Sequence, residues 1–383
     1  MVLIHWKKSQ LQPVGGPSGY LYNLNCGFAL NHIDGYSFLP DAKESHFRGS
    51  LKRIMPQWVK DRYLLSKCLS MPNSLPGSAV ADYSEYEALH FHSTESMFCS
   101  RGGLDGYSGK VILTSHTPCA QHKELISLLN TNDARKYESK LRDLAIIDKY
   151  SFERADYIIF PCREAEEPYF HTWKEYETIR DESKIRYVPT GILPAKAQVS
   201  RKEVRLRYGI PFDAFLGCYV GRHTSIKGYD VLKEQAHSLV KDSSDWFLVA
   251  GREGPLFGYE HPRWVEAGWT NDPHSLISAA DYFILPNRET YFDLVLLEVL
   301  SLGKIVIASR TGGNKFFEQY KCPGILFYES PSEMMDLIRF IKETDANKRT
   351  AWGNANKALF DSEFTVDMFS RRYDSTVKDL LGA

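Results

Sequence analysis

Short apolar runs alternate along the chain with longer stretches in which apolar positions recur at a helical period. This alternation predicts repeated βαβ units and parallel sheets covered on both faces. In a first series the expected strands are 2–6, 88–92, 111–114, 157–160 and 185–188. In a second series they are 215–220, 246–250, 282–285, 305–308 and 325–327. We therefore expect an α/β protein with two Rossmann-like, doubly wound domains.

The length of 383 residues suits two domains of ordinary size. A junction at 189–194 carries two prolines and a glycine at the end of an expected strand, as a hinge between domains would. We place one domain at 1–192 and the other at 193–364. The closing stretch, about 365–383, has an amphipathic spacing and can reach back to the first domain, although its periodicity does not say on which domain it packs.

Charge and cysteine content restrict which binding partners and which cellular compartment the sequence favours. Lysine and arginine total 47 against 48 aspartates and glutamates, so no global field favours nucleic acid. The seven cysteines are widely spread and include no Cys-x-x-Cys pair, which argues against a disulfide framework and a zinc site. No apolar run approaches the roughly 18 residues of a membrane span. We expect a soluble, cytoplasmic protein that is not exported.

The segment after the expected strand 215–220 carries the most informative chemistry. Gly221 lets the backbone approach a ligand, while Arg222 supplies a planar fork of donors and Lys227 a point charge. Ligands of open parallel sheets bind beyond the carboxyl ends of strands, which is where this segment begins. The combination suits a diphosphate. The alternative is an ordinary turn with two solvated cations.

A second candidate lies in the helix expected after the strand 282–285. Asp293 is the predicted N-cap of this helix and Gly303 its predicted end. The residues around Glu298 are almost all apolar, and a carboxylate buried among them needs hydrogen-bond donors. A ligand with paired hydroxyls would supply them. A basic neighbour would do so equally well in a purely structural role.

The first domain offers weaker signals. Gly16 lies in a glycine-rich segment before a helical stretch, where backbone amides can face an anion or simply form a tight turn. His116 directly follows a strand, a position that suits either a ligand contact or a structural histidine. His90 and His92 alternate on one strand, but no carboxylate or cysteine stands at ligand spacing, so we expect no metal site.

Taken in order, these motifs resemble the retaining glycosyltransferases of GT-B architecture, the family-four or group 1 type. The resemblance extends along most of the chain. Its landmarks are Gly15, Gly16 and Gly19, Leu89 to His92, Thr114 to His116, Ala155 and Asp156, Val188 to Gly191, Gly221 and Arg222, Lys227 and Gly228, Glu298, and Ser309 to Asn314. It implies that the Gly221–Arg222 loop and Lys227 bind the diphosphate of a sugar donor, and that Glu298 holds the nucleotide ribose.

The resemblance also places His116 beside the donor sugar. We expect Gly16 to face the departing diphosphate or the acceptor, in a cleft between the two domains. Asp293 and Leu294, at the start of the helix that carries the ribose-binding glutamate, are further donor-binding candidates. Trp269 follows an expected strand end and is our candidate for the border of the base.

The chain departs from the family pattern at two positions. The family has a glutamate eight residues before the helix glutamate, where this chain has Thr290. Either Glu289, one residue away, or the hydroxyl of Thr290 then contacts the donor sugar. Asp293 stands where the family usually has a glycine, and its charge would repel a diphosphate unless it is absorbed in capping its own helix. These changes bear on sugar specificity more than on nucleotide binding.

The resemblance implies a retaining hexosyltransferase that needs no metal and no cofactor. It would move a sugar from a nucleoside diphosphate, which we expect to be UDP, to a hydroxyl of a glycan, lipid-linked or protein-linked acceptor in polysaccharide or glycoconjugate biosynthesis. One alternative is a non-catalytic GT-B partner or glycan-binding subunit of another glycosyltransferase, which is supported by Thr290 in place of the family's glutamate. The other is a sugar-nucleotide epimerase.

The segment 52–67 combines five lysines and arginines with apolar residues. Such a face can touch the inner surface of an anionic membrane that carries a lipid-linked acceptor. Pro56 interrupts the pattern, and for that reason a plain packed surface helix is the interpretation we favour over peripheral membrane contact.

Overall fold

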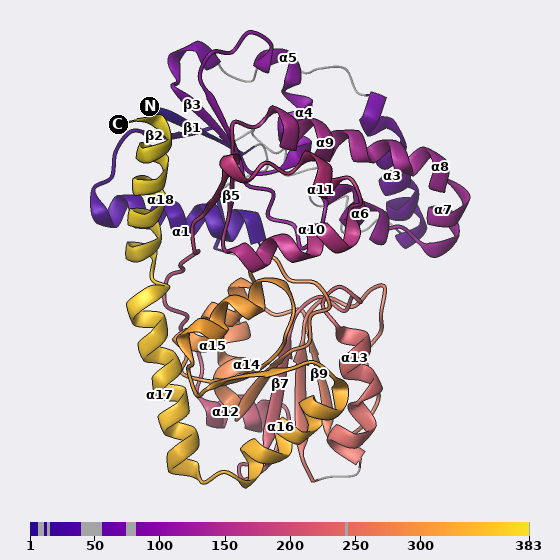
Figure 1. Cartoon of the computed structure of the whole chain (residues 1–383). Coiled ribbons are helices and arrows are strands. Elements are labelled where there is room, and N and C mark those ends of the chain that lie inside the picture. Colours follow the sequence, from indigo (N-terminus) through magenta and orange to yellow (C-terminus); the bar gives the residue numbers. More distant parts are fainter. Residues whose placement is uncertain (7–10, 14–15, 40–55, 74–81, 242–243, 383) are drawn as a thin grey trace. The chain divides into compact units, whose positions relative to one another are not determined.

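The computed structural model describes residues 1–6, 11–13, 16–39, 56–73, 82–241 and 244–382. The chain divides into two compact units, and Figure 1 follows it through both by colour. The N-terminal unit comprises Met1–Pro161, Pro168–Pro189 and Ser370–Ala383. The C-terminal unit comprises Cys162–Glu167 and Thr190–Phe369.

Six parallel strands form the sheet of the N-terminal unit, in the order β2-β1-β3-β4-β5-β6. They are β1 (Val2–His5), β2 (Tyr36–Phe38), β3 (Ala88–Phe91), β4 (Lys110–Leu113), β5 (Tyr157–Phe160) and β6 (Ile185–Tyr187). Every residue of β1 and β3 is buried, because a parallel sheet has both faces covered. The edge strand β2 is only half-buried and was not predicted from the sequence.

Helices connect these strands. They are α1 (Gly16–Asn31), α3 (Gln57–Ser70), α4 (Thr94–Cys99), α5 (Arg101–Leu104), α6 (Gln121–Ser127), α7 (Thr131–Lys136), α8 (Glu138–Leu141), α9 (Ala145–Arg154), α10 (Glu167–Thr172), α11 (Tyr176–Ile179) and, at the end of the chain, α18 (Val366–Leu381). Short 3₁₀ segments of this unit are η1 (Met71–Asn73), η2 (Tyr83–Glu85), η3 (Arg142–Leu144) and η5 (Glu182–Lys184), whereas η4 (Arg163–Glu166) belongs to the C-terminal unit.

The C-terminal unit repeats the plan with six parallel strands in the order β12-β11-β10-β7-β8-β9. They are β7 (Leu216–Val220), β8 (Trp246–Ala250), β9 (Trp264–Gly268), β10 (Tyr282–Leu285), β11 (Ile305–Ser309) and β12 (Ile325–Tyr328). Its helices are α12 (Arg201–Arg207), α13 (Tyr229–Glu234), α14 (Pro273–Ala279), α15 (Leu294–Ser301), α16 (Pro331–Glu343) and α17 (Ala346–Glu363), with a π segment η6 (His237–Lys241) and a 3₁₀ segment η7 (Gly312–Tyr320). The predicted α/β fold with two doubly wound parallel sheets is confirmed.

The helix α18 completes the core of the N-terminal unit. Tyr373 is fully buried, its ring lies nearly parallel to that of His90, and its hydroxyl is 2.6 Å from Nδ1 of that histidine. The hydroxyl of Tyr36 donates to Asp374 at 2.9 Å. These contacts attach the helix to β2 and β3.

The strand order of the C-terminal unit reverses between β7 and β10, which are neighbours in the sheet. Loops that leave two strands on either side of such a reversal open a ligand crevice. The loop after β7 rests on the loop after β10 at Gly228, which has a left-handed φ of 66°. A Cβ atom at this position would lie 1.6 Å from the carbonyl oxygen of Pro286. Only glycine therefore lets the two loops meet.

Replacing Gly228 with alanine should destabilise the protein more than the same change at Gly209. Both glycines have a φ of 66°, but a Cβ at Gly209 would meet nothing within 4 Å. The left-handed backbone alone costs an alanine about 1 to 2 kcal/mol, and Gly228→Ala adds a backbone clash. Chemical denaturation of both variants checks this. Equal losses of unfolding free energy would show that the loops separate without cost.

Candidate functional site

The loop after β7 carries the predicted anion-binding residues. The amide of Gly221 donates to the carbonyl of Ala250 at 2.9 Å, which fixes the start of the loop against the next strand. The Arg222 side chain is exposed, whereas that of Lys227 is 24% exposed. Nζ of Lys227 lies 2.6 and 2.8 Å from the two carboxylate oxygens of Asp293. The predicted phosphate ligand is thus held by a carboxylate from the loop after β10.

Asp293 occupies the N-cap position of α15, but its side chain makes no capping hydrogen bond, so the predicted capping role is wrong. Its carboxylate instead binds Lys227 and accepts a hydrogen bond from Nδ2 of Asn287 at 2.5 Å. Burial alone would raise the pKa of Asp293, but Lys227, Asn287 and Arg222 outweigh burial and lower the pKa below its ordinary value. The acid is therefore ionised and neutralised by a lysine.

Thr290 is more deeply buried than Glu289. Thr290 is 1% exposed, and among the described residues its Oγ1 has no hydrogen-bond partner. The backbone carbonyl of Thr290 accepts a hydrogen bond from the amide of Gly313 at 2.9 Å. A Cβ atom on Gly313 would lie 2.0 Å from the carbonyl oxygen of Tyr291, so only glycine fits there. Glu289 is half-buried. A buried, unsatisfied hydroxyl is costly, so the environment of Thr290 calls for a polar ligand.

Glu298 lies in α15 with its side chain 25% exposed, and its Oε2 is 3.5 Å from Nε2 of His274. Burial alone would lower the pKa of His274, but its interactions with Glu298 outweigh burial and raise the pKa above its ordinary value. The basic neighbour of Glu298, which was expected as an alternative but could not be identified from the sequence, is His274. It was missed because it precedes its partner by 24 positions, on another helix.

The remaining donor-binding candidates are more accessible. Trp269 follows β9 directly and is 62% exposed. Leu294, the first residue of α15, is half-buried. Gly16 begins α1, and a Cβ there would meet nothing within 4 Å. The preceding residue, Gly15, lies outside the described residues.

In the N-terminal unit, the half-buried His116 lies beside the buried His92. Its Nε2 is 2.8 Å from Nδ1 of the fully buried His92, and its backbone has a left-handed φ of 59°. Burial lowers the pKa of His116 to about 3, so the ring is neutral at physiological pH. The neighbouring His90 contacts Oγ1 of Thr114 at 2.9 Å, and that hydroxyl donates to the carbonyl of Ile159. His90 therefore donates through Nε2 and accepts from Tyr373 through Nδ1.

Helix α3 begins after Pro56, which occupies its N-cap position and does not interrupt it. Trp58 and Tyr63 are 67% and 62% exposed. The earlier part of the predicted basic segment, 52–55, lies outside the described residues. In the part of the chain that the structure describes, we find no helix with the length and apolar character needed to cross a membrane.

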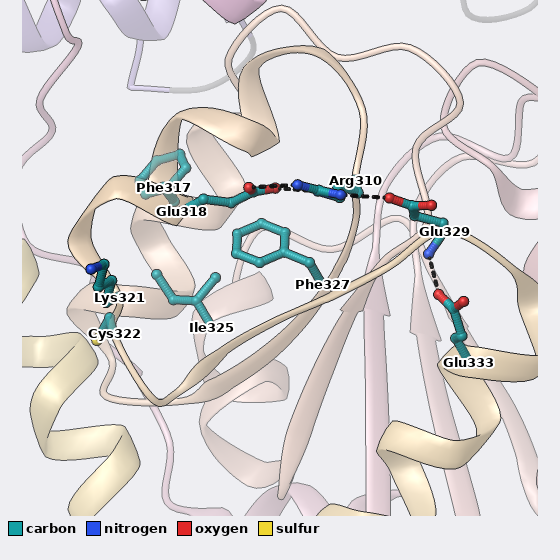
Figure 2. Close-up of a pocket in the computed structure, with 9 residues that line it drawn as sticks. All are labelled: Arg310, Phe317, Glu318, Lys321, Cys322, Ile325, Phe327, Glu329 and Glu333. Carbon is teal, nitrogen blue, oxygen red and sulfur yellow. Dashed lines mark hydrogen bonds and ion pairs between the residues drawn. The ribbon is translucent and has the colours of Figure 1, made fainter.

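A cavity of about 590 Å³ lies at the β11 and β12 end of the second sheet (Figure 2). Arg310 crosses it and forms ion pairs with Glu318 and Glu329 at 2.7 Å each. Phe327 and Ile325 line the cavity beside this arginine in Figure 2. None of the predicted site residues lines it, so this cavity is separate from the Lys227–Asp293 site.

Comparison with known protein families matches part of the second unit by sequence. Residues 215–342 match the family model described as Glycosyl transferases group 1. The chain is 26% identical over 185 residues to an O-antigen biosynthesis glycosyltransferase, WclY, of Escherichia coli, covering 46% of this chain and 50% of that protein. It is 27% identical over 179 residues to the UDP-Gal:alpha-D-GlcNAc-diphosphoundecaprenol alpha-1,3-galactosyltransferase of Escherichia coli, covering 42% and 44%. The chain thus spans about half the length of these curated relatives.

Solved structures match the chain over its whole length. Sucrose-phosphate synthase from Thermosynechococcus elongatus has a TM-score of 0.67 at 18% identity and covers 100% of this chain and 99% of its own. HepE from Anabaena in complex with UDP-glucose has a TM-score of 0.64 at 13% identity, with 99% of both chains covered. By the sequence of residues 215–342 and by the fold of the whole chain, the protein resembles the glycosyl transferases of group 1 and shares their GT-B architecture.

Proposed function

We propose that the chain is a retaining hexosyltransferase that transfers a sugar from UDP to a hydroxyl of a glycan-type acceptor, free or linked to lipid or protein. The observation that carries the proposal is the pairing of Lys227 with Asp293 beside the exposed Arg222, at the strand-order reversal of the second sheet. The matching segment includes all three residues. Support for UDP comes from a relative named for UDP-galactose and from a solved structure containing UDP-glucose.

The proposed chemistry needs no metal at the reacting atoms. Arg222 and Lys227 would stabilise the charge that grows on the leaving diphosphate, and preorganised charges of this kind usually contribute most to the rate. Asp293 neutralises Lys227, and a diphosphate must therefore compete for that ammonium group. Arg222 is exposed and adds positive charge on the same loop.

Neutral polar groups would recognise the sugar. Thr290 offers a buried hydroxyl without a partner among the described residues. His116, uncharged because burial lowers its pKa to about 3, would act as a hydrogen-bonding group and not as a proton-transferring acid. Glu298 would accept hydrogen bonds from ribose hydroxyls in addition to its contact with His274.

Thermal-shift assays with UDP, GDP, ADP and their sugar conjugates test the proposal. A nucleotide at 100 times its Kd should stabilise the wild type by about 2.7 kcal/mol. We expect UDP and one UDP-sugar to respond, and that sugar should be transferred to an acceptor in the presence of EDTA. In Arg222→Ala and Lys227→Met the affinity for UDP should fall about 10- to 150-fold, since each loses a charge-assisted hydrogen bond worth about 1.5 to 3 kcal/mol.

Arg207→Ala is the matched control, because Arg207 is exposed on α12 and lies in none of the candidate motifs. It should bind UDP like the wild type. Wild-type affinity in both loop variants would refute the diphosphate assignment. Binding without transfer to any acceptor would favour the non-catalytic alternative, and conversion of the UDP-sugar without an acceptor would favour an epimerase.

Glu298→Gln should weaken binding of UDP at least about fivefold, the effect of losing about 1 kcal/mol of hydrogen bonding, while leaving inorganic pyrophosphate unaffected. The same variant should lower the pKa of His274, because burial remains and the attracting charge is removed. Calorimetry measures the first effect and an NMR titration of the imidazole the second. Equal losses for UDP and pyrophosphate would contradict the ribose role even if the pKa falls.

Thr290→Val should reduce turnover with the UDP-sugar while leaving the thermal stability unchanged or higher, because the variant keeps the shape and removes an unsatisfied buried hydroxyl. Glu289→Gln is the matched comparison and should have the smaller effect on turnover. Steady-state kinetics and thermal unfolding of both variants distinguish the two residues. A large loss in Glu289→Gln with normal turnover in Thr290→Val would assign the sugar contact to the glutamate.

A further inference from the structure

Three side chains outside the proposed donor site converge at the β8 and β9 side of the second sheet. His223 follows β7, Glu253 follows β8, and Glu266 lies in β9. One nitrogen or carboxylate oxygen from each lies within 4.8 Å of those of the other two. His223 is fully buried, Glu266 is half-buried and Glu253 is exposed, so the group reaches from the interior to the surface.

Hydrogen bonds and ring stacking hold His223 and Glu266 in place. The imidazole of His223 stacks on the ring of Tyr229, with centroids 3.8 Å apart and 7° between the planes. Oε1 of Glu266 accepts from the hydroxyl of Tyr229 at 2.6 Å and from Nε1 of Trp264 at 2.7 Å. Its Oε2 remains toward His223, 3.8 Å from Nε2. A carboxylate with one oxygen fixed by neighbouring donors is typical of metal ligands.

Among the described residues, the buried imidazole of His223 lacks the hydrogen-bond partners that a buried polar group needs. Neither ring nitrogen of His223 makes a hydrogen bond to any described residue, although the side chain is 0% exposed. A buried imidazole without a hydrogen-bond partner in the described parts of the chain, beside two carboxylates, needs a ligand that all three groups can bind.

We propose that His223, Glu253 and Glu266 bind one divalent transition-metal ion, with Zn²⁺ as the representative. One imidazole and two carboxylates are ligands that such ions accept, whereas Ca²⁺ takes six to eight oxygens. The ion would join the loops after β7 and β8 to β9 and so stabilise this end of the sheet. This site could not be predicted from the sequence, because the three positions are far apart and form no recognisable spacing.

Zinc binding to the full chain, after treatment with EDTA, tests the site. We expect the wild type to bind one Zn²⁺ and to melt at a higher temperature with it. Glu253→Gln should weaken that binding about 100-fold or more, judged against the 10- to 100-fold losses typical of removing groups that merely orient ligands. This variant keeps an acceptor for the amide of Gly258, which bonds to Oε1 of Glu253 at 3.1 Å, and should fold normally. His223→Gln is a second variant with the same expected loss.

Glu329→Gln is the matched control, since this exposed glutamate lies in the Arg310 cavity. It should bind Zn²⁺ like the wild type. The free cysteines are competing ligands, and Co²⁺ distinguishes them because thiolate ligands give an intense charge-transfer absorption that nitrogen and oxygen ligands lack. Wild-type zinc affinity in Glu253→Gln and His223→Gln, a thiolate absorption band for the bound Co²⁺, or no binding by the wild type would each overturn the proposal.

Discussion

The contact between Gly228 and the carbonyl of Pro286 decides the geometry of the candidate site. It brings the loop after β7 against the loop after β10 with no space for a side chain between them. Lys227 immediately precedes the contact, and Asp293 follows it within one short loop, so the two charges meet at 2.6 Å. Because the partners come from strands on either side of the reversal in strand order, the pair depends on the sheet as well as on the loops.

Pairing of Lys227 with Asp293 changes how the departure from the family pattern is understood. A carboxylate in place of the usual glycine would repel a diphosphate if it stood alone. Here the acid is neutralised by the very lysine that is proposed to bind the phosphates. The loop therefore carries the net charge of Arg222 alone, and nucleotide affinity depends on how readily Lys227 exchanges a carboxylate for a phosphate oxygen.

The sequence predicted the strands that are apolar throughout, because burial on both faces leaves a continuous local pattern. It did not predict β2, which is half-buried, and it indicated β9 only by its end, because this strand carries Glu266 among apolar residues. The failures at the site have a different cause. Capping by Asp293 was a local inference, whereas its actual partner is 66 positions away. Contacts such as His274 with Glu298 leave no trace in spacing, since the fold alone brings them together.

The position of Tyr373 has a consequence for the order in which the protein can be completed. This residue fills the core of the N-terminal unit against His90, although 283 positions separate them. On the ribosome, part of the core of the N-terminal unit must therefore remain exposed to solvent until Tyr373 has emerged. The residues of the C-terminal unit all precede Ser370, where α18 enters the N-terminal unit, so the C-terminal unit can finish folding first. This reverses the usual N-to-C order of domain folding during synthesis.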